Sequence, residues 1–189
     1  RQVLLSIGGW GSGRFSEMAA NDEYRRAFAA DCDRVVKEFA LDGIDIDWEY
    51  PTSSMANISS SPDDTENFTL LMQDIRAAIG NEKELTLATV ASARYIDFKA
   101  ILPSVDFVNI MAYDMASAPK HHSALYPSGH SGDITSDGAV TAHLKAGVPP
   151  SKLVMGMPFY GRGGDGYPSF QDYNKVGNTD TQYTEKWDE

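Results

Sequence analysis

The segment LDGIDIDWEYP, residues 41–51, decides the fold because it alternates two kinds of side chain. Ile44, Ile46 and Trp48 occupy every second position, and acidic residues occupy the positions between them. Successive side chains of a β-strand point to opposite faces, so the segment predicts a strand with one apolar face and one acidic face. The acidic face is expected to carry Asp45, Asp47 and Glu49.

Four other apolar segments predict further strands, and helical patterns lie between them. The strand candidates are residues 3–9, 43–50, 85–91, 107–114 and 152–160, and the helix candidates are 22–40, 65–79, about 96–102 and 137–146. Strands that alternate with helices indicate a parallel sheet covered by helices, either an open doubly wound sheet or a (β/α)8 barrel. No G-x-G-x-x-G follows any strand, so the dinucleotide-binding version of the open sheet has no support.

The chain is short for a complete barrel. Five strands are too few, and 189 residues fall below the typical length of about 250. The sequence also opens directly on a predicted strand, RQVLLSIGGW. We therefore expect an α/β fold that is part of a (β/α)8 TIM barrel within a longer chain.

The helix predicted at 22–40 is expected to begin at an Asn21 or Asp22 cap. Its apolar side chains recur at spacings of three and four, which predicts one buried stripe. The stripe consists of Tyr24, Phe28, Cys32, Val35 and Phe39. Because Cys32 falls on this stripe, it is expected to be a core thiol, and as the single cysteine it cannot form an internal disulfide.

Composition restricts the possible partners. The net charge of −11 argues against nucleic acid, whose phosphates require a basic surface. No apolar run is long enough to cross a bilayer, so no membrane insertion is expected. A neutral or cationic ligand such as a sugar polymer is compatible with this charge.

Three carboxylates on one strand face suggest catalysis. Stacked carboxylates couple, so that an ionised group raises the pKa of its neighbour. Glu49, the last of the three before Pro51 ends the strand, is best placed to meet a ligand at the carboxyl end of a barrel strand, as a general acid. A metal site and a solvated acidic face are the alternatives. Calcium loops, however, place turn residues and a central glycine between their acidic ligands, whereas Ile and Trp stand there in this strand.

Several motifs together resemble one enzyme family. The pattern D-x-x-D-x-D-x-E over residues 42–49, followed by Tyr50-Pro51, resembles the signature of family 18 glycoside hydrolases, the chitinase family. SIGGW (6–10), MAYD (111–114) and GMPFYGR (156–162) are similar to that family's third, sixth and seventh barrel strands. KWDE (186–189) resembles part of the small α+β insertion that follows. The resemblance therefore implies a partial barrel over residues 1–161 and the start of that insertion over 162–189.

The resemblance implies hydrolysis of β-1,4-linked N-acetylglucosamine polymers by a substrate-assisted, retaining mechanism. Glu49 would be the general acid and base, and Asp47 would hold the acetamido N–H of the substrate. Asp45 would share a proton or hydrogen bond with Asp47, and Tyr113 would bind the acetamido oxygen. The substrate-binding residues would be Trp10, Met111, Asp114, Tyr160 and Arg162, with Arg162 as the ionic partner of Asp114.

Other aromatic and imidazole side chains are assigned to structure. Trp48 shares the parity of the apolar strand face, so it is expected in the core. The four histidines, His121, His122, His130 and His143, have no metal-ligand spacing on a shared face, and we expect loop or surface positions for them. No metal and no cofactor are expected, and the partner is chitin or an N-acetylglucosamine oligosaccharide.

The family's first, second and eighth strands are not among these 189 residues, so the isolated piece is expected to be inactive. Three functions stay open: a chitinase of endo or exo action, an endo-β-N-acetylglucosaminidase on N-glycans, and a chitinase-like sugar-binding protein without catalysis. The presence of Glu49 disfavours the last. The resemblance implies a secreted, periplasmic or cell-surface location.

Overall fold

The computed structural model describes residues 1–162 of the chain. They divide into two units. Unit 1 comprises Arg1–Thr89, Ala93–Asn109 and Leu144–Val154. Unit 2 comprises Val90–Ser92, Ile110–His143 and the residues from Met155 onward, of which 155–162 are described. The insertion expected over 162–189 lies outside the described residues, apart from Arg162.

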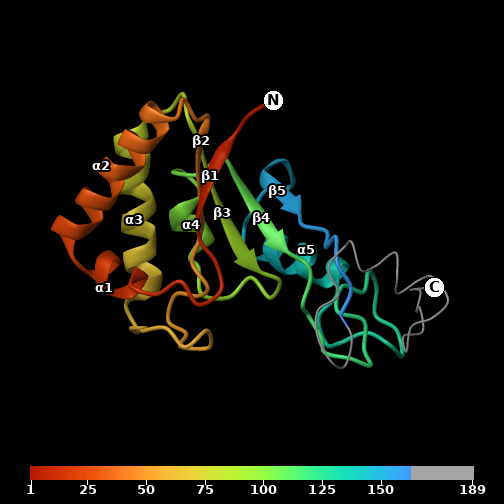
Figure 1. Ribbon diagram of the computed structural model, residues 1–189. Helices are drawn as coiled ribbons and strands as arrows, with labels where there is room; N and C mark the ends of the chain where they lie inside the picture. Colours follow the sequence, from red (N-terminus) through yellow and green to blue (C-terminus); the bar gives the residue numbers. More distant parts are fainter. Residues whose placement is uncertain (163–189) are drawn as a thin grey trace. The chain divides into compact units, whose positions relative to one another are not determined.

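Strands and helices alternate along the chain (Figure 1). The strands are β1 (Leu4–Gly8), β2 (Gly43–Asp47), β3 (Glu84–Val90), β4 (Phe107–Met111) and β5 (Leu153–Met155). The helices are α1 (Phe15–Ala20), α2 (Asp22–Glu38), α3 (Asp64–Ile79), α4 (Phe98–Ile101) and α5 (Ser136–Lys145), and a 3-10 turn spans Pro150–Lys152. All five predicted strands and all four predicted helical segments are present, so the alternation is confirmed.

The strands form one sheet in the order β1-β2-β3-β4-β5, and β2 pairs in parallel with β1 and β3. Ser6, Asp45 and Thr86 lie in register across the first three strands, so their side chains share one face of the sheet. Two glycines permit this close pairing. A Cβ on Gly8 would lie 2.0 Å from the carbonyl oxygen of Asp47, and one on Gly43 would lie 2.0 Å from that of Glu84.

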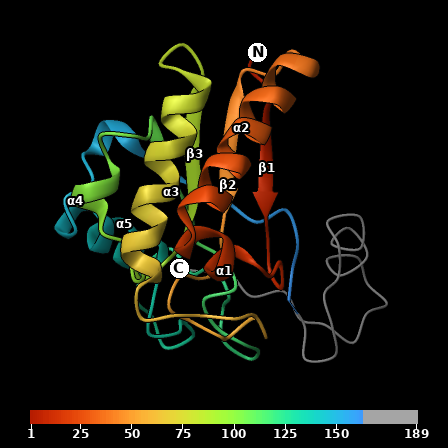
Figure 2. The ribbon, with the colours of Figure 1, turned by 90° about the vertical axis from the view of Figure 1, so that its left-hand side faces the viewer.

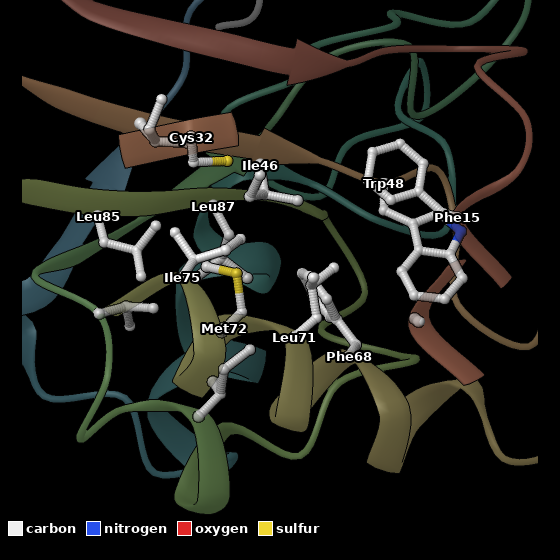
Figure 3. Close-up of a cluster of buried hydrophobic side chains, with 14 of the residues drawn as sticks. Phe15, Cys32, Ile46, Trp48, Phe68, Leu71, Met72, Ile75, Leu85 and Leu87 are labelled. Carbon is white, nitrogen blue, oxygen red and sulfur yellow. The ribbon is translucent and has the colours of Figure 1, made fainter. Parts of the chain in front are cut away.

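Helices α2 and α3 lie side by side on one face of β1, β2 and β3 (Figures 1 and 2). The apolar side chains of β2 and β3 pack there against α3, as Figure 3 shows for Ile46, Leu87, Met72 and Ile75. Trp48 is 2% exposed and stacks on Phe15 with ring centroids 5.4 Å apart. The prediction that the apolar strand face and Trp48 belong to the core is confirmed.

The buried stripe of α2 differs from the predicted one. Asn21 caps the helix as expected, since its Oδ1 accepts from the backbone N–H of Tyr24 at 3.0 Å. Tyr24 and Phe39, however, are 58% and 65% exposed, and the buried residues are Arg25, Ala29, Cys32 and Val36. Arg25 is buried because its guanidinium donates to Asp74, Asp22 and the backbone of Ala19. Cys32 lies in the core as predicted.

Asp64 anchors the segment that follows β2. Its side chain is fully buried and accepts from the Ser16 hydroxyl at 2.7 Å and from the backbone N–H groups of Thr52 and Ser61 at 3.1 and 2.8 Å. A buried carboxylate is stable only when such donors satisfy it. Asp64 therefore fixes the start of α3 to α1 and to the chain just after Glu49.

Candidate active site

The sequence-predicted site residues fall into two groups, one in each unit. Trp10, Asp45, Asp47 and Glu49 belong to unit 1. The second group belongs to unit 2 and consists of Met111, Tyr113, Asp114, Tyr160 and Arg162.

Asp45 accepts hydrogen bonds from three different strands. Its Oδ2 accepts from the Ser6 hydroxyl of β1 at 2.8 Å. Its Oδ1 accepts from the Thr86 hydroxyl of β3 at 2.6 Å and from the Asn109 amide of β4 at 3.2 Å. Hydrogen bonds to a charged group are stronger than those between neutral groups. Asp45 on β2 is thus a fixed acceptor, and no local sequence pattern indicates its three donors, which lie on other strands.

Asp47, two residues along β2, has a contrasting environment. Burial and then the negative charges of Glu49 and Asp45 raise the pKa of its carboxyl to about 7. Its Oδ1 is buried and has no hydrogen-bond donor within residues 1–162. A carboxylate that is partly desolvated, close to like charges and short of donors binds a proton more tightly. Asp47 can therefore gain or lose a proton near neutral pH.

Glu49 lies just beyond β2, which ends at Asp47 and not at Tyr50 as predicted. The Glu49–Tyr50 peptide bond is cis. The Tyr50 side chain makes a hydrogen bond with Glu49, and burial, the Glu49 charge and this bond all raise the pKa of the Tyr50 phenol. The Tyr50 ring stacks on that of Tyr95 with centroids 5.4 Å apart. Tyr50 and Tyr95 are thus further candidates for shaping the site. The position of Tyr50 directly after Glu49 in the motif could have indicated Tyr50 from the sequence.

Trp10 follows the two glycines at the end of β1. Its ring is 60% exposed, and it lies edge-on to Tyr50 with centroids 6.3 Å apart. The backbone N–H of Gly9 donates to the carbonyl oxygen of Asp47 at 2.8 Å, which ties this turn to the end of β2. An exposed aromatic ring held beside Tyr50, the neighbour of Glu49 in the chain, can stack against the apolar face of a sugar.

In unit 2, Asp114 and Arg162 form a fork-to-fork ion pair, with Nε directed at Oδ1 and Nη2 at Oδ2. The hydroxyl of Tyr160 also hydrogen-bonds to Asp114, and the Arg162 guanidinium lies 5.4 Å from the centroid of the Tyr160 ring. Burial raises the pKa of the Asp114 carboxyl, but the hydrogen bonds from Arg162 and Tyr160 outweigh this effect. The pKa of Asp114 therefore lies below the ordinary value. The predicted Asp114–Arg162 pair is present.

Tyr113 precedes Asp114, and its ring lies 6.2 Å from that of Tyr160, edge to face. Gly156 allows this packing, because a Cβ there would lie 3.0 Å from Cε1 of Tyr113 and 2.7 Å from the carbonyl oxygen of Ile110. Met111 is the last residue of β4 and is half-buried.

The histidines were expected on loops or on the surface, and this is wrong for His143. It lies on α5 with no exposed area, and its Nδ1 is 2.8 Å from the carbonyl oxygen of Ala139. Helix α5 has small residues such as Ala139 at this face, which leaves room for an imidazole in the interior. His122 lies on a loop as expected, and it contacts both Asp114 and Tyr160.

Within residues 1–162, no cluster of three or more histidine, cysteine or acidic side chains has a metal-binding arrangement. The same range has no helix that is both long and apolar enough to cross a membrane.

Comparison with known proteins identifies the family. The model of the glycosyl hydrolases family 18 matches residues 1–189. The chain belongs to family 18 of the glycosyl hydrolases.

Relatives of this family 18 chain include chitinases of bacteria and animals. Chitinase A1 of Niallia circulans is 38% identical over 87% of this chain, and chitotriosidase-1 of Mus musculus is 36% identical over 85%. The chitinase domain of the spore coat protein CotE from Clostridium difficile is 37% identical, with a TM-score of 0.89 over 99% of this chain and 58% of that chain.

This chain spans 27% of the length of the Niallia enzyme and 39% of that of the mouse enzyme. Its parallel sheet and helices therefore represent part of a family 18 TIM barrel, as the sequence predicted.

Proposed function

We propose that this protein hydrolyses β-1,4-linked N-acetylglucosamine polymers, with Glu49 as general acid and base and the substrate's own acetamido oxygen as the nucleophile. The observation that supports this most directly is the environment of Asp47. Its pKa is raised to about 7, and its buried Oδ1 has no donor within residues 1–162. A site of this kind favours a ligand that brings an N–H group.

The acetamido N–H of N-acetylglucosamine is such a donor. Its arrival would give Oδ1 of Asp47 a donor, which none of residues 1–162 supplies, and would favour the ionised form. The anion would then hold the acetamide while its carbonyl oxygen attacks the anomeric carbon. It would also stabilise the positive charge that develops on the acetamide in that step. Asp45, with its three donors, would remain a fixed hydrogen-bond acceptor beneath Asp47.

Glu49 would donate its proton to the glycosidic oxygen as the bond breaks, and would then take a proton from the water that opens the cyclic intermediate. The hydrogen bond with Tyr50, whose ring is stacked on Tyr95, supports an oriented Glu49 side chain. We assign Tyr113 to the acetamido oxygen from its motif position in MAYD. Trp10, Met111, Asp114, Tyr160 and Arg162 are proposed to bind the sugar.

The relatives leave two modes of action open. The relatives from Niallia circulans and Mus musculus carry the names chitinase A1 and chitotriosidase-1. A family 18 N-acetylglucosaminidase from Paenibacillus barengoltzii is 36% identical, with a TM-score of 0.84 over 92% of this chain and 61% of that chain. Product analysis on N-acetylglucosamine pentamers and hexamers would distinguish internal cleavage from release of single sugars. We further propose that the protein acts outside the cell or at its surface, where polymeric chitin is found.

The mechanism is tested with the full-length protein and two substrates. NMR of fresh products from N-acetylglucosamine oligomers should show retention of the β-configuration, because two inversions occur at the same carbon. Fully deacetylated oligomers should not be cleaved, since they lack the nucleophile. Inverted product, or rapid cleavage of deacetylated substrate, would contradict the proposed roles of Asp47 and Glu49. Release of glycans from a high-mannose glycoprotein in place of chitin cleavage would favour the N-glycan alternative.

A further inference from the structure

His122 lies on the loop that follows β4. Its imidazole contacts Asp114, on the same loop, and Tyr160, on the segment after β5. The backbone N–H of Asp114 donates to Nδ1 of His122 at 3.2 Å, and the Asp114 Oδ1 lies 3.4 Å from the same nitrogen. On the other side, the ring makes a hydrogen bond with the backbone of Tyr160. It also stacks on the Tyr160 ring, with centroids 5.3 Å apart and planes at 28°.

These contacts define the protonation state of the ring. Because a backbone N–H donates to Nδ1, that nitrogen must carry a lone pair, so the proton of the neutral imidazole lies on Nε2. Nε2–H is then free to donate to the Tyr160 carbonyl. One ring thus joins Asp114, on the segment after β4, to Tyr160, on the segment after β5, by a hydrogen bond at each nitrogen. His122 is 12% exposed at its side chain, which favours an ordered ring.

We propose that His122 is a positioning residue whose neutral imidazole clamps Asp114 to the Tyr160–Arg162 segment and thereby sets the affinity for sugar. Asp114, Tyr160 and Arg162 are the proposed sugar-binding residues, so this inference rests on the proposed function and deepens it. His122 reaches the ligand only through them. Without the clamp, Arg162 and Tyr160 would still attract Asp114, but the direction of the Asp114 carboxylate would be less restricted.

The clamp has a predictable pH dependence. The charged and titratable groups that face His122 are Asp114, Tyr160 and Arg162. Burial lowers the pKa of His122, and the charge of Asp114 and the bond to Tyr160 offset this only in part. The ring is therefore neutral at pH 7. Protonation on acidification would place an N–H at Nδ1, which would replace the bond from the Asp114 N–H by one directed at the Asp114 Oδ1, 3.4 Å away, and would so turn that carboxylate.

The test compares three variants of the full-length protein in steady-state hydrolysis of N-acetylglucosamine oligomers between pH 4.5 and 8. His122→Phe keeps a planar ring for stacking on Tyr160 and removes both hydrogen bonds. His122→Asn keeps an acceptor oxygen and a donor. His130→Phe makes the same ring exchange at an exposed histidine of the same loop and is the matched control.

For His122→Phe we expect KM to rise about tenfold at pH 7 with kcat changed less than threefold, because loss of a binding interaction appears mainly in KM. We also expect KM of the wild type to rise on acidification, as His122 becomes protonated. This rise should be absent in His122→Phe. His122→Asn should restore KM to within about threefold of the wild type, and His130→Phe should change nothing. An unchanged KM in His122→Phe, or the same acidic rise in KM, would overturn the proposal.

A second measurement needs no variant and no activity. In ¹⁵N-labelled wild-type protein, NMR should show His122 as a neutral ring protonated at Nε2 at pH 7. A ring protonated at Nδ1, or at both nitrogens, would refute the clamp. If the wild type neither binds nor cleaves the oligomers, the proposed function fails, while the NMR result still decides whether the clamp exists.

Discussion

Asp47 in unit 1 and Asp114 in unit 2 are both partly buried carboxyl groups, yet their pKa values move in opposite directions. At Asp47, burial acts together with the charges of Glu49 and Asp45, and the pKa rises to about 7. At Asp114, burial is outweighed by hydrogen bonds from Arg162 and Tyr160, and the pKa falls below the ordinary value. Both residues are aspartates, but the charged neighbours of Asp47 are negative and Arg162, the neighbour of Asp114, is positive.

This difference separates two tasks. A carboxyl group that exchanges a proton near neutral pH suits catalysis, and one that stays anionic suits binding of hydroxyl groups. Changes at Asp47 and Glu49 should therefore act on kcat or on the pH dependence of stability. Changes at Asp114 should act on KM.

The largest effect is expected for Glu49→Gln, which keeps the shape of the side chain and removes its transferable proton. In the full-length protein, kcat on N-acetylglucosamine oligomers should fall about 10²–10⁴-fold or more, while oligosaccharide binding survives. Steady-state kinetics and calorimetric binding measure the two quantities. Glu66→Gln, at an exposed position of α3, is the control and should change neither. Near-normal turnover of Glu49→Gln would exclude Glu49 as the acid.

A smaller effect is expected for Asp114→Asn, which keeps the size of the side chain and removes the charge opposite Arg162. KM should rise about tenfold with a lesser change in kcat, since the lost interaction is one of binding. Asp137→Asn makes the same exchange at an exposed position on α5 and should leave KM unchanged. A loss confined to kcat would show that Asp114 takes part in the chemical step, and the contrast with Asp47 would then fail.

Asp47→Asn should make the stability of the protein less sensitive to pH. The folded protein binds the Asp47 proton with a pKa of about 7, against an ordinary value of 3.8. Between these values the folded state holds more protons than the unfolded state, so the free energy of unfolding falls as pH rises. In Asp47→Asn this fall in the free energy of unfolding is absent, because the amide does not titrate.

After allowance for solvent screening, Asp47→Asn should exceed the wild type in stability by about 2 kcal/mol above pH 7, and by nothing near pH 4. Urea unfolding at pH 4, 5.5 and 7.5 measures the difference. A constant offset between the two proteins at all three values would contradict the raised pKa.

The smallest effect is expected for Thr86→Val, which removes one donor from Asp45 at nearly constant shape. We expect a loss of about 1–2 kcal/mol in the free energy of unfolding, because a charged acceptor loses a hydrogen bond. Thr89→Val is the matched control, at an equally buried threonine on the same strand whose hydroxyl donates to the backbone of Asn109. Equal losses in both variants would mean that the bond to Asp45 has no special weight.

Much of this fold follows from local pattern. The alternation in residues 43–48 predicted β2 and placed Ile44, Ile46 and Trp48 in the core, because a strand has a period of two. The buried face of α3 also follows from its apolar spacing. In α2 the same reasoning was wrong about Tyr24 and Phe39. The buried face of α2 contains Arg25, whose ion pair with Asp74 links this helix to α3.

Some features of the candidate site also follow from the sequence, and others follow only from the tertiary structure. The sequence by itself predicted which residues could carry the chemistry, because Asp45, Asp47 and Glu49 stand at every second position of one segment and their mutual repulsion is local. Only the tertiary structure decided how each carboxyl group differs. Ser6, Thr86 and Asn109 reach Asp45 through the register of β1, β3 and β4, and His122 reaches Asp114 through a loop. The two partners of each of these hydrogen bonds are 8 to 64 residues apart, so no local pattern indicates them.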